Sequence, residues 1–140
     1  MTKSVSRMCV LTLALVVTRL LAATPEFLTP AISPAELDTK QKAGEVLLII
    51  DVREPHEFAY VRVSGAMNIP VAELESHLEA VEQAQMTILY CMDGRRTRLA
   101  EKTLLDHGIA NVFHLEGSLP AWVQGGFPIE KGRPGRQTIQ

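Results

Sequence analysis

Hydrophobic residues along this chain gather in short uninterrupted runs. Residues 46–50 read Val-Leu-Leu-Ile-Ile and lie between Gly44-Glu45 and Asp51. Such a run is typical of a strand that is buried on both faces, as in a parallel sheet. Shorter runs predict further strands over 67–69, 87–90 and 112–115.

Between these runs, the residues follow helical patterns. A first helix is predicted to begin at Ser33, because serine can cap a helix, Pro34 suits the first helical position and Glu36 completes a capping box. Gly44 is expected to end this helix.

Three more helices are predicted over 71–82, 95–107 and 119–124. In the second of them, the apolar residues share one face, and Glu101 is assigned to the other side. Strands that alternate with helices indicate an α/β domain with a mainly parallel sheet.

The first residues have the three-part pattern of a secretory signal peptide. Lys3 and Arg7 form a basic start, residues 8–17 are mostly apolar, and Ala22-Ala23 supplies small residues for cleavage. The apolar run is shorter than the roughly 20 residues of a transmembrane helix. We therefore expect an exported protein, with the periplasm as its compartment; a retained N-terminal anchor is the alternative.

The predicted organisation has four parts. They are a signal peptide at 1–23, a short linker at 24–32, one folded domain at 33–132 and a loose tail at 133–140.

Composition and charge exclude some partners. The 140 residues are 46% hydrophobic and 21% charged, as in an ordinary globular domain. Without residues 1–23, the chain has 11 basic and 16 acidic residues, a net charge of −5. Such a domain, with no run of Lys or Arg, is not expected to bind nucleic acid. No membrane partner is expected unless the N-terminal segment is kept as an anchor.

Loss of the signal peptide would leave Cys91 as the only cysteine. It follows a predicted buried strand and precedes a short loop and a helix. Loop N–H groups and a helix N-terminus attract negative charge, and such a field favours thiolate over thiol. Arg95 and Arg96 add positive charge, and Gly94 allows a tight loop.

A persulfide on Cys91 would place a negatively charged sulfur inside this loop. An acceptor that attacks the terminal sulfur would then complete transfer in two steps, without a metal or cofactor. The competing interpretation is an inert cysteine buried at a strand end, a common setting for free cysteine. The glycine and the paired arginines favour the working thiol, because an inert cysteine does not need them.

The pattern Cys91-x-x-Gly94-x-Arg96-Thr97 resembles the active-site loop of single-domain rhodaneses. Further segments that resemble this family, in the same order, are 51–58, 64–70 and 108–122. The resemblance implies a five-stranded, mainly parallel sheet with helices on both faces. It also implies a thiosulfate sulfurtransferase-like enzyme, with a small sulfur donor and a thiol, cyanide or acceptor protein as partners.

The resemblance also assigns roles to residues. Cys91 is the expected catalytic residue. The expected substrate-binding residues are the rest of the loop: Met92, Asp93, Gly94, Arg95, Arg96 and Thr97. Asp51 and Arg53, at the end of a predicted buried strand, are expected as supporting residues that brace or line the pocket; the alternative is a structural ion pair or a turn cap. No metal site is expected, because the four histidines show no ligand spacing.

Several positions depart from the family pattern. Met92 replaces a residue that is often basic, and Asp93 puts a carboxylate into a loop that binds anions. Because like charges repel, we expect thiosulfate to bind weakly. Arg62-Val63 replaces the usual histidine, and Ser118 replaces the second glycine of the closing turn.

Three other functions stay open. A phosphatase or arsenate reductase would need five residues between cysteine and arginine, whereas four separate Cys91 from Arg96. A non-catalytic binding module would not use the thiol. A thiol-redox or sulfur-trafficking partner would use the same thiol toward another protein.

Overall fold

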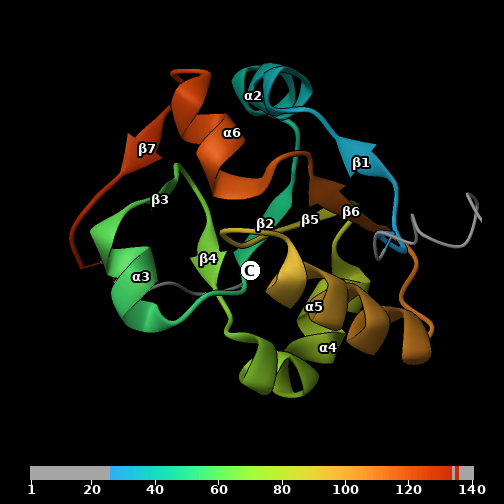
Figure 1. Cartoon of the computed structure of the whole chain (residues 1–140). Helices are drawn as coiled ribbons and strands as arrows, with labels where there is room; N and C mark the ends of the chain where they lie inside the picture. Colours follow the sequence, from blue (N-terminus) through green and yellow to red (C-terminus); the bar gives the residue numbers. More distant parts are fainter. Residues whose placement is uncertain (1–25, 134, 136–140) are drawn as a thin grey trace, which may run out of the picture.

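The computed structural model describes residues 26–133 and 135 (Figure 1). The predicted signal peptide lies outside these residues, as does most of the predicted tail. Within the described part, no helix is both long enough and apolar enough to cross a membrane.

A five-stranded sheet forms the centre, and all its neighbouring strands are parallel, in the order β1–β6–β5–β2–β4. The strands are β1 (Ala31–Ile32), β2 (Leu48–Asp51), β4 (Met67–Asn68), β5 (Thr87–Tyr90) and β6 (Val112–Leu115). Asp51 of β2 is in register with Tyr90 of β5, so these central strands end at the same edge of the sheet. The predicted fold class is confirmed.

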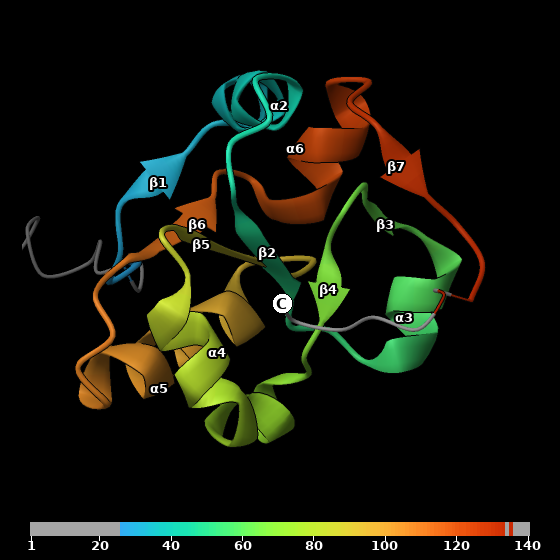
Figure 2. The same cartoon turned by 180° about the vertical axis from the view of Figure 1, so that it is seen from behind.

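Helices cover both faces of this sheet (Figures 1 and 2). One core is shared by α2 (Pro34–Lys42), α3 (Pro55–Tyr60) and α6 (Ser118–Gln124). The other is shared by the 3-10 helix η1 (Val71–His77), α4 (Leu78–Gln83) and α5 (Arg95–Asp106). A small antiparallel pair, β3 (Arg62–Val63) with β7 (Ile129–Glu130), lies beside the first core.

Strand β5 contributes to both cores. Neighbouring residues of a strand point to opposite faces, so Ile88 and Tyr90 pack on the α6 side, and Leu89 packs on the α5 side. Continued one residue further, the alternation places the buried Cys91 on the α5 side.

The predicted helices occur, with one difference. Ser33 caps α2 as expected, accepting a hydrogen bond from the Glu36 N–H at 3.2 Å. The helix predicted over 71–82 is divided into η1 and α4. At the division, the side chains of Ser76 and His77 contact the Glu73 carbonyl oxygen at 2.6 and 3.0 Å, in place of an uninterrupted α-helical pattern.

Three short strands were not predicted. β1 falls inside the expected linker at 24–32, where it pairs with His114 and Leu115 of β6. β3 and β7 are likewise two residues each. A two-residue strand is too short to show a hydrophobic period, and its position is set by the strand that it pairs with.

Glu101 of α5 is a clear departure from the prediction. Expected on the solvent side, it is 0% exposed. Its carboxylate accepts hydrogen bonds from the Leu28 N–H at 2.9 Å and from the Thr29 hydroxyl. The residues that precede β1 pack against this part of α5 and bury Glu101. Helical spacing within α5 could not predict this, because the contact comes from a segment that is distant in the sequence.

Candidate active site

The cysteine loop lies between the end of β5 and the start of α5. The Gly94 N–H donates a hydrogen bond to the Cys91 sulfur, with a nitrogen–sulfur distance of 3.1 Å. Gly94 has φ +84°, in the left-handed region that favours glycine. The predicted strand, loop and helix therefore aim one backbone donor at the sulfur.

Cys91 itself is 0% exposed. A hollow of about 470 Å³ lies beside the loop, and its lining residues are Glu57, Met92, Asp93, Arg95, Arg96 and Leu99. A larger hollow of about 580 Å³ lies elsewhere, near the start of β2, and contains neither cysteine nor arginine. We take the smaller one as the candidate site because Met92, Asp93, Arg95 and Arg96, which follow Cys91 in the chain, are among its lining residues, whereas the buried Cys91 is not.

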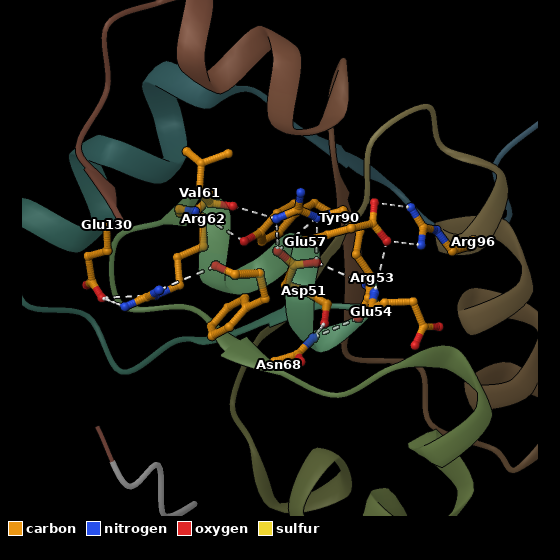
Figure 3. Close-up of polar contacts among 12 residues, drawn as sticks. Asp51, Arg53, Glu54, Glu57, Val61, Arg62, Asn68, Tyr90, Arg96 and Glu130 are labelled. Carbon is orange, nitrogen blue, oxygen red and sulfur yellow. Dashed lines mark hydrogen bonds and ion pairs between the residues drawn. The ribbon is translucent and has the colours of Figure 1, made fainter. Parts of the chain in front are cut away.

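Arg96 is held by a carboxylate from α3 (Figure 3). Its two terminal nitrogens donate to the Glu57 carboxylate at 2.5 and 2.9 Å. These hydrogen bonds lower the pKa of Glu57 to about 2 and raise the pKa of Arg96. The side chains of Arg96 and Glu57 remain 31% and 25% exposed, so the pair lies within reach of solvent.

Glu57 was not among the predicted site residues. It occupies the third position of α3, where it accepts a hydrogen bond from the Glu54 N–H at 3.1 Å and completes a capping box. Glu54-Pro55-x-Glu57 is a sequence signal for a helix start. It could have placed Glu57 on α3, but the contact with Arg96 depends on how α3 and α5 pack.

Arg95 is paired within the loop. Its Nε donates to Asp93 at 2.6 Å, and its backbone N–H donates to the same carboxylate at 3.1 Å. The backbone hydrogen bond and then the side-chain hydrogen bond lower the pKa of Asp93. Each arginine at the hollow thus faces one carboxylate, and the two pairs together carry no net charge.

Asp51 and Arg53 form a second ion pair, which is buried (Figure 3). The Arg53 Nη2 lies 2.6 Å from Asp51 and also donates to the Val61 carbonyl at 2.7 Å. Neither residue lines the hollow beside the loop. The contacts are those of a structural ion pair, and the Arg53 N–H also donates to Asp51 at 3.0 Å, as in a turn cap.

The pair also adjoins Tyr90 at the end of β5. The Tyr90 hydroxyl accepts a hydrogen bond from the Val63 N–H at 3.1 Å. Burial, and then the nearby Asp51 carboxylate, raise the pKa of Tyr90 far above its ordinary value. A neutral tyrosine thus joins the end of the cysteine-bearing strand to β3.

Thr97 and Met92 differ strongly in exposure. Thr97 is 1% exposed, and its hydroxyl has no hydrogen-bond partner among the described residues. Met92 is 42% exposed, beside the 58% exposed Leu99 of the same hollow. The rim of the hollow therefore offers apolar surface as well as paired charges.

Arg62 and Ser118, the two positions outside the cysteine loop that depart from the family pattern, have structural roles. Arg62 lies 2.9 Å from Glu130, which links β3 to β7. Ser118 has φ +54°, and within the described residues it alone among non-glycines has a positive φ. This explains why glycine suits the position. The next residue, Leu119, donates its N–H to the Cys91 carbonyl at 3.1 Å, so this turn supports the base of the loop.

Comparison with known proteins identifies the family. The family model of the rhodanese-like domain matches residues 33–125, more than half of the chain. The chain belongs to this family, as its motifs predicted.

Related proteins include sulfurtransferases. The uncharacterized protein slr1261 of Synechocystis is 34% identical over 100 residues, which are 71% of this chain and 55% of that protein. Thiosulfate sulfurtransferase GlpE of Stutzerimonas stutzeri is 29% identical over 91 residues, 65% of this chain and 82% of GlpE. Membership of a family that contains sulfurtransferases is therefore established.

A solved structure supports the fold. The thiosulfate sulfurtransferase from Pseudomonas aeruginosa superposes with a TM-score of 0.69 at 24% identity, over 79% of this chain and 22% of that one. The chain thus spans about half the length of slr1261 and less than a quarter of the Pseudomonas protein. The rhodanese fold predicted from the sequence is confirmed.

Proposed function

We propose that this protein is a sulfurtransferase that carries sulfane sulfur as a persulfide on Cys91. The observation that carries the proposal is the 3.1 Å hydrogen bond from the Gly94 N–H to the Cys91 sulfur, in a loop that opens α5. A backbone donor and a helix N-terminus favour negative charge on sulfur. The same arrangement suits both the thiolate and a persulfide anion.

The reaction has two displacements. The Cys91 thiolate attacks the sulfane sulfur of a donor such as thiosulfate; a new S–S bond forms, the donor S–S bond breaks, and sulfite leaves with the electron pair. An acceptor thiolate then attacks the terminal sulfur and departs as a persulfide, which restores the thiolate. No external oxidant is needed, and each step is nucleophilic catalysis.

The rim residues divide between charge and apolar contact. Arg96 is the proposed contact for an anionic donor, which must exchange with Glu57 to use the guanidinium. The exposed Met92 and Leu99 suit the apolar part of an organic thiol or of an acceptor protein. The neutral rim favours these acceptors, so sulfur trafficking to a partner protein is the second candidate function.

Replacement of the nucleophile tests the proposal. Cys91→Ser should abolish both turnover and the mass gain of one sulfur atom after incubation with thiosulfate or an organic persulfide. Its melting temperature should stay close to that of the wild type, because serine differs little in volume. Turnover by the serine variant would refute the proposal, and a wild-type protein that gains no sulfur from either donor would indicate a binding module.

We also propose that residues 1–23 direct export, on the basis of the basic and apolar pattern described above. Mass spectrometry of the protein from fractionated cells tests this. Export predicts a shortened chain outside the cytoplasm, and a full-length chain confined to the cytoplasm would contradict it.

A further inference from the structure

Residues 26–30, which we call the N-terminal strap, lie beside β6 and are drawn in blue ahead of β1 in Figure 1. The strap is held by the buried Glu101. The carboxylate accepts from the Leu28 N–H and the Thr29 hydroxyl, and the His114 Nδ1 lies 3.2 Å from it. A fully buried carboxylate with these partners ties the strap to α5 and β6, because breaking such contacts would leave it unpaired.

Phe27 of the strap sits between this anchor and the cysteine loop. Its ring stacks on His114, with ring centroids 3.8 Å apart and planes inclined by 12°. The Arg98 guanidinium lies 5.3 Å from the same ring. These two contacts fix the position of the ring from α5 and from β6.

The far edge of the Phe27 ring meets Gly94. A Cβ placed on Gly94 would lie 2.7 Å from the Phe27 Cζ, closer than carbon atoms approach without displacement. Gly94 also has φ +84°, so a side chain at this position would be strained by the backbone angle and would have to displace the Phe27 ring. This same residue gives its N–H to the Cys91 sulfur.

We propose that Phe27 is a positioning residue that holds the turn at Gly94, so that its N–H stays directed at the Cys91 sulfur. Glycine has the widest backbone freedom of any residue, so a ring packed against Gly94 restricts the conformations that are open to this turn. The strap precedes residues 33–125, the part that matches the family model. The inference rests on the proposed role of Cys91 as a nucleophile.

The test compares variants of the full chain by the reactivity of the thiol. Alkylation of Cys91 by iodoacetamide is followed by peptide mass spectrometry, which distinguishes it from Cys9 of the full chain. The rate is measured between about pH 6 and about pH 9, where thiolate formation controls it. Phe27→Ala should slow alkylation at neutral pH by about fivefold, as expected for the loss of one hydrogen bond, and move the pH profile upward. Phe27→Tyr keeps the ring and should match the wild type.

Leu28→Ala is the matched control, because Leu28 belongs to the same strap and its side chain is exposed. It should leave the pH profile unchanged. If Phe27→Ala does not fold, Phe27→Leu serves instead, since leucine fills part of the space but is too short to reach Gly94.

The outcomes separate positioning from general stabilisation. An upward shift of the profile in Phe27→Ala, with none in Phe27→Tyr or Leu28→Ala, supports the inference. A lower melting temperature with an unchanged profile would overturn it, because the ring would then only stabilise the fold. Alkylation does not require sulfur transfer, so a wild type that alkylates but transfers no sulfur would refute the proposed function alone.

Discussion

Two arginine–carboxylate pairs lie close to the cysteine loop, and their surroundings differ. Arg53 and Asp51, beneath the loop, have side chains that are 1% and 0% exposed. Arg96 and Glu57, at its rim, are 31% and 25% exposed. Figure 3 shows both pairs in one view, with Arg53 near Tyr90 and Arg96 reaching across to α3.

The difference in exposure implies different roles for the two pairs: the buried pair supports the fold, and the exposed pair can exchange partners. The buried pair is satisfied inside the protein, since Arg53 also donates to the Val61 carbonyl and Asp51 also accepts from the Arg53 N–H. Water cannot replace a lost partner there. At the rim, water or an anionic substrate can take the place of Glu57 at modest cost. An arginine–carboxylate pair can therefore stabilise the fold where it is buried. Where it is exposed, the carboxylate can instead control whether an anion reaches the Arg96 guanidinium.

The largest expected effect comes from breaking the buried pair. Asp51→Asn should lower the free energy of unfolding by about 3–5 kcal/mol, because it leaves the Arg53 charge buried without its counterion. Urea unfolding measures the change.

Asp106→Asn is the matched control for this variant. It makes the same chemical change in the exposed Lys102–Asp106 pair. It should cost less than about 1 kcal/mol. Equal losses in the two variants would show that burial does not distinguish the pairs.

A smaller effect, on substrate binding and not on folding, is expected at the rim. Glu57→Gln should lower the KM for thiosulfate by about fivefold at low salt, because it removes a charge that competes for Arg96 and repels a dianion. Glutamine can still accept the Glu54 N–H, so α3 keeps its start. Glu54→Gln, which makes the same change at the exposed N-cap residue of α3, should leave KM unchanged. A higher KM in Glu57→Gln would mean that Glu57 orients Arg96 for the donor.

The rim pair also gives a pH dependence with a definite sign. Arg96 holds the pKa of Glu57 at about 2, below its ordinary 4.5. The stability contributed by the Glu57 carboxylate is therefore fully present above about pH 4.5 and is lost as the pH falls toward about 2. In urea unfolding, the stability difference between wild type and Glu57→Gln should shrink over this range. A difference that grows on acidification would contradict the assignment.

The sequence predicted those parts of the site that are local in the chain. The site's strand, loop and helix follow one another within residues 87–107. Their order follows from hydrophobic runs and turn chemistry. The family motifs supplied the five-stranded sheet, which no periodicity within single elements could have given.

The features missed at the site and beneath the strap depend on contacts between distant segments. Glu57 meets Arg96 across 39 positions, and Thr29 meets Glu101 across 72. Helical spacing within α5 put Glu101 on a solvent face, because it contains no information about the strap that covers that face. Charges such as Asp93 were visible in the sequence, but their effect could not be judged until the partner, Arg95, was placed.

The smallest expected effect is at the exposed pair of the loop. Asp93→Ser should raise kcat/KM for thiosulfate, but only by about twofold, because Arg95 already balances the carboxylate and solvent screens what remains. Serine is chosen because its hydroxyl can still accept the Arg95 N–H that Asp93 binds at the start of α5. The gain should disappear when salt is raised to about 0.5 M, where the Debye length is only a few ångströms. Asp106→Ser, at the other end of the same helix, controls for the change in net charge. A gain in kcat/KM that survives high salt, or one equal to that of Asp106→Ser, would rule out local repulsion by Asp93. The preference for one sulfur donor over another would then depend on Glu57 and on the apolar residues of the rim.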